Sequence, residues 1–329
     1  MRLARQDAAA RSDSPLAAVT GATGFIGRHL VAELHRAGWR VRLLLRREPD
    51  VAEWRDLPPP QVVAGALDDD AALERLVEGA DVVIHLAGLI KAARRHDFLA
   101  VNRDGAAAMA RAVERAAPSA RFVLVSSLAA REPQLSDYAA SKRAGEGAVL
   151  DVLGSRATVL RPPVVYGPGD RETLLFFQLA GKRLVPLLGR AGSRAAMIHV
   201  ADLVRLLVAM APQPRRGAEV RSAADDRPQG YTWEELLAAA ARAVGNSTPR
   251  FVRAPSTLLS GVALVGDLAK AFGSSSMISS QKLRELRHPD WGVAPAERAT
   301  APGWTAQFDL ERGFADAVAW YRKAGWLTA

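Results

Sequence analysis

The chain has 329 residues, 49% of them hydrophobic, and is long enough to bury a full core as one large domain or two coupled ones. It contains no cysteine, which excludes disulfides and thiolate metal sites and makes a reducing compartment the natural expectation. The 44 Lys and Arg against 35 Asp and Glu give a net charge of +9, which favours anionic ligands. Because the arginines are spread through helical segments, a phosphorylated cofactor or a membrane surface is favoured over nucleic acid.

The ends and the apolar runs of the chain indicate how it relates to membranes. Residues 1–15 are polar or alanine-rich, lack the apolar stretch of a secretory signal and are expected to form a flexible tail. The longest apolar run, Leu258 to Phe272, is interrupted by Asp267 and Lys270, so no membrane span is expected. We expect a cytoplasmic protein, with the inner face of the membrane as a further option.

Short β-rich runs alternate with helical patterns from Leu16 to about Val165, which predicts a parallel sheet built from βαβ units. The expected strands are 17–20, 41–45, 61–64, 82–86, 122–126 and 158–160. The expected helices are 28–37, 71–78, 102–116 and 138–153. The fold class is therefore α/β, with the six strands of a doubly wound sheet.

A second, smaller lobe is predicted where the alternation stops. The prolines and glycines of 162–169 indicate a loop-rich departure from the sheet. Helices are expected at 171–183 and 232–244, whereas Ile198 to Ala209 is expected to return to the first domain as a turn and helix. The predicted nucleotide-binding domain is thus 16–165 with about 195–224, and the predicted substrate-binding lobe is 166–194 with 225–329.

A glycine pattern follows the first strand, with the sequence Thr20-Gly21-Ala22-Thr23-Gly24-Phe25-Ile26-Gly27. Glycines permit a tight turn and a close backbone approach, and the unsatisfied N–H groups of the next helix can hold a pyrophosphate. Both the strand and the helix that this motif requires are present, so the pattern predicts a dinucleotide-binding Rossmann fold. The residues expected at the phosphates are Gly21, Thr23, Gly24, Phe25, Ile26 and Gly27.

The end of the second strand indicates which dinucleotide is bound. In NAD-binding folds an acid here takes the ribose hydroxyls, but Leu45 runs directly into Arg46 and Arg47. A guanidinium offers a rigid donor fork that suits a 2′-phosphate. NADP(H) is therefore favoured over NAD(H).

Catalytic side chains are predicted after the fifth strand. Ser126 and Ser127 end this strand, and Tyr138 and Lys142 lie four residues apart on one face of the following helix. A nearby ammonium and an oxidised nicotinamide favour the phenolate, so Tyr138 can donate or accept a proton. A serine hydroxyl at the sheet edge can hydrogen-bond the substrate oxygen where charge develops.

With these motifs the sequence resembles the extended short-chain dehydrogenases/reductases, the NAD-dependent epimerase/dehydratase-like family. Further matches in the family's order are His85 to Gly88, Val101-Asn102, Leu160 to Pro162, Val165 to Gly169 and Ile198 to Asp202. The resemblance implies that Tyr138 is the general acid/base, that Lys142 holds the ribose and that Ser127, with Ser126 as alternate, contacts the substrate oxygen. It also implies a homodimer and cofactor contacts from Arg46, Arg47, Leu67, Asp68, Ala87, Gly88, Tyr138, Lys142, Pro163 and Val165.

The sequence departs from the family pattern at two places. The interval between Ser127 and Tyr138 is short, and Ala66 replaces the acid often found after the third strand, so Asp68 or Asp69 is left to contact the adenine. Asn102 has two open interpretations, a helix cap or a functional role. His85, His199 and Asp202 are interpreted as structural, because no set of ligands with metal spacing is present and no metal is expected.

The second lobe is expected to determine the substrate. Its apolar segment 255–278 fits a substrate pocket, a buried core helix or a membrane contact. Residues 282–291 and 320–327 are similar to bacterial relatives that act on lipids, among them the reductases of bacterial sphingolipid synthesis. This resemblance implies NADPH-dependent reduction of a hydrophobic ketone, either a 3-oxosphingoid, a 3-oxoceramide or a steroid-like compound. Two alternatives are open. One is a sugar-nucleotide epimerase or dehydratase, in which the diphosphate of the substrate would be bound by Lys182, Arg183, Arg190 and Arg194. The other is a non-catalytic NADPH-binding subunit.

Overall fold

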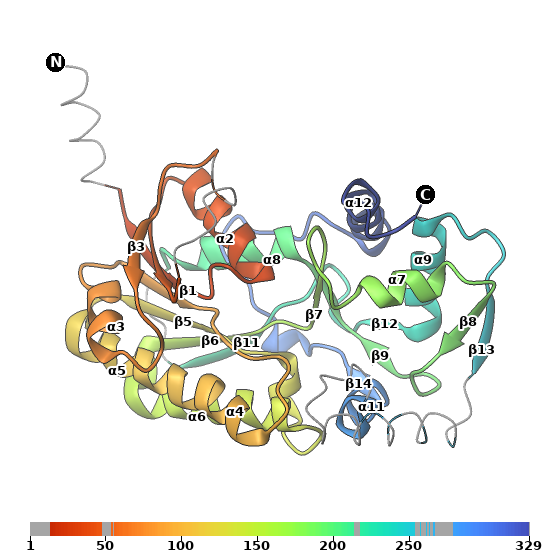
Figure 1. The fold of residues 1–329 in the computed structure, drawn as a ribbon, viewed down its shortest axis with the longest axis horizontal. Coiled ribbons are helices and arrows are strands. Elements are labelled where there is room, and N and C mark those ends of the chain that lie inside the picture. The colour runs from red at the N-terminus through yellow and green to blue at the C-terminus, as the bar shows by residue number, and fades with distance from the viewer. Residues whose placement is uncertain are drawn as a thin grey trace.

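The protein is built around one seven-stranded parallel sheet (Figure 1). The computed structural model describes residues 14–47, 54, 56–213, 218–253, 257, 261, 263, 266 and 279–328. The strand order is β11-β6-β5-β4-β1-β2-β3. The strands are β1 (Leu16–Thr20), β2 (Arg40–Leu45), β3 (Gln61–Ala64), β4 (Val82–His85), β5 (Arg121–Val125), β6 (Ala157–Arg161) and β11 (Glu219–Ser222). This confirms the predicted doubly wound fold.

The order of the strands reverses direction at the centre of the sheet. The chain begins at β1, proceeds outward through β2 and β3, and then crosses back to β4 on the other side of β1. In doubly wound sheets the carboxyl ends of the two strands at such a reversal flank the ligand site. The residues that follow β1 and β4 are therefore adjacent in space.

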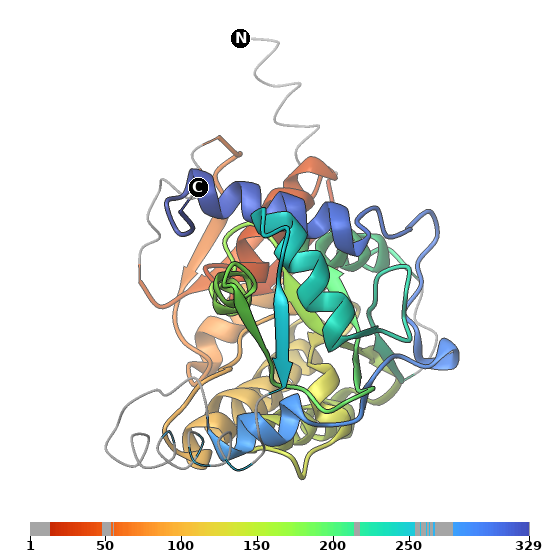
Figure 2. The ribbon, with the colours of Figure 1, turned by 90° about the vertical axis from the view of Figure 1, so that its right-hand side faces the viewer.

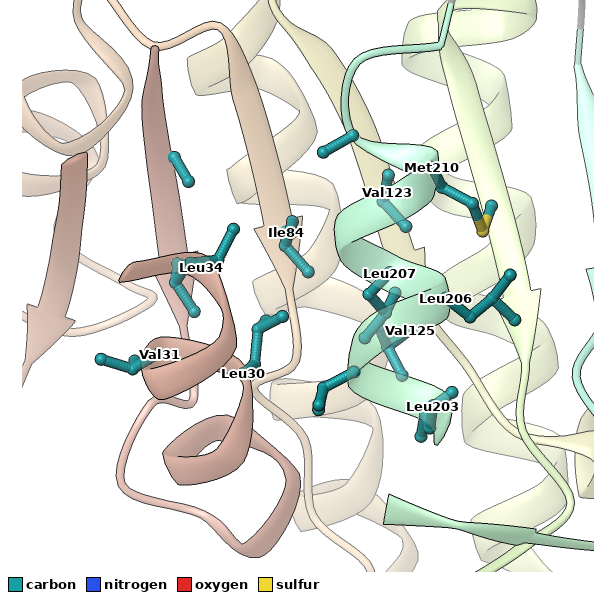
Figure 3. Packing of buried hydrophobic residues seen from close by; sticks show 14 of the residues in the cluster. Leu30, Val31, Leu34, Ile84, Val123, Val125, Leu203, Leu206, Leu207 and Met210 are labelled. Atoms are coloured by element: carbon teal, nitrogen blue, oxygen red, sulfur yellow. The ribbon is translucent and has the colours of Figure 1, made fainter. Parts of the chain in front are cut away.

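Helices cover both faces of the sheet. One face carries α2 (Phe25–Arg36) and α8 (Val200–Met210), and the other carries α3 (Asp70–Val77), α5 (Ala106–Ala116) and α6 (Asp137–Leu153). Figure 3 shows the side chains of α2 and α8 directed at apolar residues of the central strands. Apolar residues recur at helical spacing along α2 and α8, so each helix buries one stripe against the sheet.

Most of the predicted elements lie within one residue of their observed limits, but three helices differ and one strand of the sheet was not predicted. The helix expected over 171–183 is shorter, α7 (Leu174–Ala180), and is followed by Gly181 at its C-cap. The strand β11 was not predicted, because it is an edge strand whose only strongly apolar residue, Val220, is exposed. The helix α2 starts at Phe25 instead of Arg28, since Gly24 takes the N-cap position. The helix expected over 102–116 begins earlier, as α4 (Arg95–Leu99), and continues through a π-helical stretch, η2 (Ala100–Gly105), into α5.

The remaining elements form the second lobe, whose aromatic core includes Tyr166, Phe177, Phe314 and Tyr321. Figure 2 views this lobe face on, with α12 across α9 and with β8 beside β13. The elements are β7 (Val164–Tyr166), α7 (Leu174–Ala180), β8 (Leu184–Leu187), β9 (Arg194–Ala195), β10 (Met197–His199), β12 (Tyr231–Thr232), α9 (Trp233–Val244), β13 (Arg250–Arg253), α11 (Ser280–Leu286), β14 (Asp290–Trp291) and α12 (Leu310–Lys323). Three short 3-10 helices complete the list of elements: η3 (Leu128–Arg131) and η4 (Gly154–Arg156) pack on α6 in the first domain, and η5 (Pro295–Glu297) contacts β11.

Two predicted features fall largely on residues that are not described. Residues 1–13 of the expected tail and most of the apolar segment 255–278 lie outside the described residues, so their predicted roles stay open. Among the described residues, no helix combines the length and apolar character needed to cross a bilayer.

Candidate active site

The turn from β1 into α2 requires glycine at two positions. Gly21 has φ +74°, and a Cβ there would lie 2.7 Å from the backbone N of Ala87. A Cβ at Gly27 would lie 2.1 Å from the carbonyl oxygen of Gly21. Gly21 therefore lets the loop pack tightly against the end of β4, and Gly27 lets the first turn of α2 pack against the loop.

The first turn of α2 fits an anionic ligand. Its N-cap residue, Gly24, offers no side-chain acceptor, and this fully described helix has no acidic residue in its first turn. Thr23 and Gly24 are exposed, while Phe25 and Ile26 are half-buried. The N–H groups at this end receive no side-chain cap from Gly24 and carry the positive end of the helix dipole, so they suit a pyrophosphate.

The arginines expected at the 2′-phosphate lie on the next strand of the sheet. Arg46 and Arg47 directly follow the last residue of β2, and both are exposed. Because β2 pairs with β1 in parallel, these side chains lie at the same sheet edge as the glycine loop. Their position and charge are compatible with a phosphate on the adenosine ribose.

The residues expected around the adenine follow β3. Leu67 packs over η2, since a Cβ at Gly105 would lie 2.7 Å from its Cδ1 atom. Asp69 is the N-cap of α3 and accepts a hydrogen bond from the backbone N of Ala72 at 2.9 Å. Asp68 is exposed. Of the two aspartates that could replace the missing acid, Asp69 is thus already engaged and Asp68 is available.

The end of β4 is held by a buried pair of side chains. His85 is fully buried and its Nδ1 atom lies 2.8 Å from Oγ1 of Thr20, which in turn accepts a hydrogen bond from the backbone N of Ala87. Burial, assisted by the charge of Lys142, lowers the pKa of His85 to about 3, so the ring is neutral. His85 therefore has the surroundings of a core histidine, and it fixes the turn leading to Ala87 and Gly88.

The structure brings together the three side chains expected to be catalytic. The side chain of Ser127 lies beside the phenol of Tyr138, close enough to lower its pKa. Lys142, one turn along α6, is buried, and its Nζ atom donates to the carbonyl oxygen of Val125 at 2.9 Å. That Nζ atom also lies 3.6 Å from the position of a Cβ at Gly88. The three groups therefore converge at the carboxyl ends of β4 and β5.

Burial acts in opposite directions on the two ionisable groups. It raises the pKa of Tyr138 to about 12, with a hydrogen bond from Ser127 opposing the shift and the charge of Glu285 adding to it. It lowers the pKa of Lys142 to about 8, partly offset by Glu146. At neutral pH the phenol is therefore protonated and can donate a proton, and most of the lysine carries its charge.

The geometry separates the two neighbouring serines. Ser126 is buried, and its hydroxyl donates to Oε1 of Glu146 at 2.6 Å. Glu146 also accepts two hydrogen bonds from the buried guanidinium of Arg161, at 2.8 and 2.6 Å. Ser126 thus belongs to a buried structural network, whereas Ser127 is the serine beside Tyr138.

Asn102 does not cap a helix, so that interpretation was wrong. It is buried inside η2, where its Oδ1 accepts from the backbone N of Leu89 at 2.8 Å. Its Nδ2 donates to the carbonyl oxygen of Leu89 and to Oγ of Ser141, both at 2.9 Å. Asn102 therefore ties the loop after β4 to the helix that carries Tyr138 and Lys142, and the π-helical turn accommodates it.

The remaining residues singled out in the sequence lie beyond β6. Pro163 and Val165 are half-buried on either side of the start of β7, which pairs with β10. His199 caps α8 and stacks on Phe308 with ring centroids 3.9 Å apart, and burial lowers its pKa to about 4. Asp202 is fully buried and accepts backbone hydrogen bonds from residues 307 and 308. These contacts are structural, and the described part of the chain contains no cluster of side chains that could hold a metal ion.

The protein combines a doubly wound sheet, a glycine loop and a set of Ser, Tyr and Lys side chains at the carboxyl edge of the sheet. These features together define the short-chain class of NAD(P)-dependent oxidoreductases. Residues 17–223 match the NAD dependent epimerase/dehydratase family. The chain belongs to this family, which corresponds to the extended short-chain dehydrogenases/reductases. It is an NAD(P)-dependent oxidoreductase that acts on a small molecule.

Two curated relatives and one solved structure illustrate the range of similar proteins. The ceramide reductase of Caulobacter vibrioides is 49% identical over 312 residues, which cover 94% of this chain and 95% of that protein. The subunit 9 of the NADH dehydrogenase 1 alpha subcomplex of Arabidopsis thaliana is 31% identical over 63% of this chain and 53% of that protein. The UDP-glucose 4-epimerase of Bifidobacterium longum, solved with NAD+ and UDP, shares the fold with a TM-score of 0.68 and 20% identity over 94% of this chain and 99% of that chain.

Proposed function

We propose that the protein is an NADPH-dependent reductase that converts the ketone of a hydrophobic lipid, the 3-oxo group of a ceramide or sphingoid base, to an alcohol. The observation that supports the reaction type is the position of Ser127 beside Tyr138, with the buried Lys142 one helical turn away. The substrate class is supported by the 49% identity to a ceramide reductase over nearly the whole of both chains.

The proposed roles follow from where the groups lie. When bound, NADPH supplies the hydride. Ser127 donates a hydrogen bond to the carbonyl oxygen of the substrate, and Tyr138 gives its phenolic proton to that oxygen as the alcohol forms. Lys142 holds the ribose and adds positive charge beside the phenol. Because burial keeps Tyr138 protonated at neutral pH, the site suits reduction of a ketone better than oxidation of an alcohol.

The binding of NADPH is proposed from the same edge of the sheet. The first turn of α2 would receive the pyrophosphate, and Arg46 with Arg47 would receive the 2′-phosphate. Leu67 and Asp68 would contact the adenine, whereas Ala87, Gly88, Pro163 and Val165 would line the ribose and nicotinamide. No strand-end carboxylate has to be displaced for the 2′-phosphate, since Arg46 directly follows β2.

One assay distinguishes the proposed reaction from its alternatives. NADPH absorbance is followed with a 3-oxoceramide, a 3-oxosphingoid base, a ketosteroid and UDP-sugars, and stoichiometric oxidation with the oxolipids is expected. Conversion of a UDP-sugar without net NADPH consumption would identify an epimerase instead, because an epimerase returns its hydride. Tight NADPH binding with no turnover of any compound would identify a non-catalytic subunit.

We also propose that the protein attaches to an anionic membrane through the surface formed by β8 and β13. On β8 and β13 the side chains of Leu184 and Val252 are 60% and 48% exposed. The neighbouring Lys182, Arg183 and Arg250 are exposed as well. This combination of apolar and basic side chains suits the surface of an anionic bilayer.

The membrane contact can be tested with vesicles. Flotation with vesicles of phosphatidylglycerol and phosphatidylcholine is expected for the wild type and is expected to be lost when Leu184→Asp and Val252→Asp are combined. Val62→Asp, at another exposed valine on β3, is the matched control. A wild type that does not float, or a double variant that floats equally well, would contradict the attachment.

A further inference from the structure

The chain entering the catalytic helix is held by a segment far away in the sequence. The residues at 135, 136 and 137 immediately precede Tyr138, and each is hydrogen-bonded by a side chain of α11. Nε of Arg284 donates to the carbonyl oxygen at 135 at 3.0 Å. Gln281 forms a reciprocal pair with Asp137, accepting from its backbone N at 2.9 Å and donating to its carboxylate at 2.7 Å.

The central contact of this set is buried and charged. The hydroxyl of Ser136 donates to Oε1 of Glu285, and both residues are less than a tenth exposed. Ser136 is also the N-cap of α6, where its Oγ accepts from the backbone N of Ala139 at 3.0 Å. The other carboxylate oxygen of Glu285 lies 3.1 Å from Nζ of Lys282. One carboxylate thus fixes the hydroxyl that begins the helix carrying Tyr138.

The rest of the segment anchors α11 beside the same loop. Nε1 of Trp291 donates to the carbonyl oxygen of Glu285 at 2.8 Å. Arg131, in η3, donates to the carbonyl oxygens of Asp290 and Gly292. Ser127 is the N-cap of η3, and Tyr138 lies in the first turn of α6. This segment therefore contacts both elements that carry these side chains.

We propose that α11 is a positioning clamp for the catalytic helix and that Glu285 is its positioning residue, because its carboxylate holds Ser136 and thereby the Tyr138 phenol in register with Ser127. The inference rests on the proposed function, in which Tyr138 donates the proton. It also identifies a physical link between the second lobe and the proton donor, since α11 lies in that lobe by sequence and contacts the first turn of α6. Small misplacements of reacting groups reduce rates strongly even when binding is unchanged.

The test compares variants of Glu285 in the full chain. Glu285→Ala is expected to slow single-turnover hydride transfer about tenfold, while the Kd for NADPH and the KM for the oxolipid stay within about twofold. Glu285→Gln, which keeps an acceptor for Ser136, is expected to recover most of the rate. Arg287→Ala is the matched control, because within the described residues no side-chain hydrogen bond of Arg287 reaches the loop before Tyr138.

A second measurement does not depend on turnover. Hydrogen exchange is expected to accelerate at the amides of 138–142 in Glu285→Ala, with or without NADPH, and to be unchanged there in Arg287→Ala. If Glu285→Ala does not fold, Gln281→Ala removes the contact to Asp137 alone and takes its place in both measurements.

The outcomes separate the clamp from the proposed function. Unchanged exchange at 138–142 overturns the clamp even if the wild type reduces no oxolipid, a result that would defeat the proposed function instead. With an active wild type, the clamp is overturned by an unchanged hydride-transfer rate in Glu285→Ala, or by a loss that Glu285→Gln fails to recover.

Discussion

Lys142 is the residue whose charge should control the reaction across the accessible pH range. Its ordinary pKa is 10.5, and burial lowers it to about 8, so the ammonium is present below about pH 8 and is lost above it. We expect kcat/KM for oxolipid reduction to fall above about pH 8, by about tenfold per pH unit, because the proposed ribose contact and the positive charge disappear together.

The control for this pH dependence is Lys142→Arg. A guanidinium stays charged throughout the range, so the alkaline decrease near pH 8 should vanish even though the smaller residual rate reflects altered geometry. A wild-type profile that is flat to pH 10, or an unchanged decrease in Lys142→Arg, would show that another group is responsible.

Arg46 tests the preference for NADPH at the level of a single side chain. Arg46→Ala should weaken NADPH binding about 10- to 100-fold, since a hydrogen bond to a charged group contributes about 1.5–3 kcal/mol. NADH, which lacks the 2′-phosphate, should bind within about twofold of its original affinity. Fluorescence titration with both cofactors measures this, and equal losses for the two would refute the assignment.

At the scale of the element, α6 is joined to β5 and β6 by the buried Ser126, Glu146 and Arg161 network. Glu146→Gln should lower the free energy of unfolding by about 3–5 kcal/mol, because it removes the carboxylate that pairs with the buried Arg161 guanidinium. Urea denaturation at pH 7 measures the change. Glu114→Gln is the matched control: it breaks the exposed pair with Arg156, and a loss below about 1 kcal/mol is expected. Equal effects of the two changes would contradict this account of the network.

The elements that the sequence predicts are those whose formation depends on local pattern. The strands β1, β4 and β6 are buried along their whole length, so each is a short apolar run that stands out from its neighbours. By contrast, β11 is an edge strand, and its sequence Glu-Val-Arg-Ser carries almost no apolar signal. The π-helical turn η2 depends on bonds from Asn102 to a loop and a helix elsewhere in the chain, which no local pattern encodes.

At the scale of the whole molecule, the candidate site was predictable as a set of residues but not as an arrangement. Ser127, Tyr138 and Lys142 were found from spacing and resemblance, yet the choice between Ser126 and Ser127 required the position of Glu146. The contacts of Glu285 and Gln281 with the loop before Tyr138 join residues 149 and 144 positions apart, so they become visible only in the folded chain. The apolar segment 255–278 lies largely outside the described residues, so its three possible roles stay predictions.

Tyr138 is the proposed proton donor in the reduction of a lipid ketone by NADPH. The most direct measurement is stopped-flow oxidation of NADPH by the wild type and by Tyr138→Phe with a 3-oxoceramide, together with the Kd of each for NADPH. The rate should fall about 10²- to 10⁴-fold while the Kd stays within about twofold, because only the acidic hydroxyl is removed. Turnover by Tyr138→Phe at the wild-type rate would contradict the account.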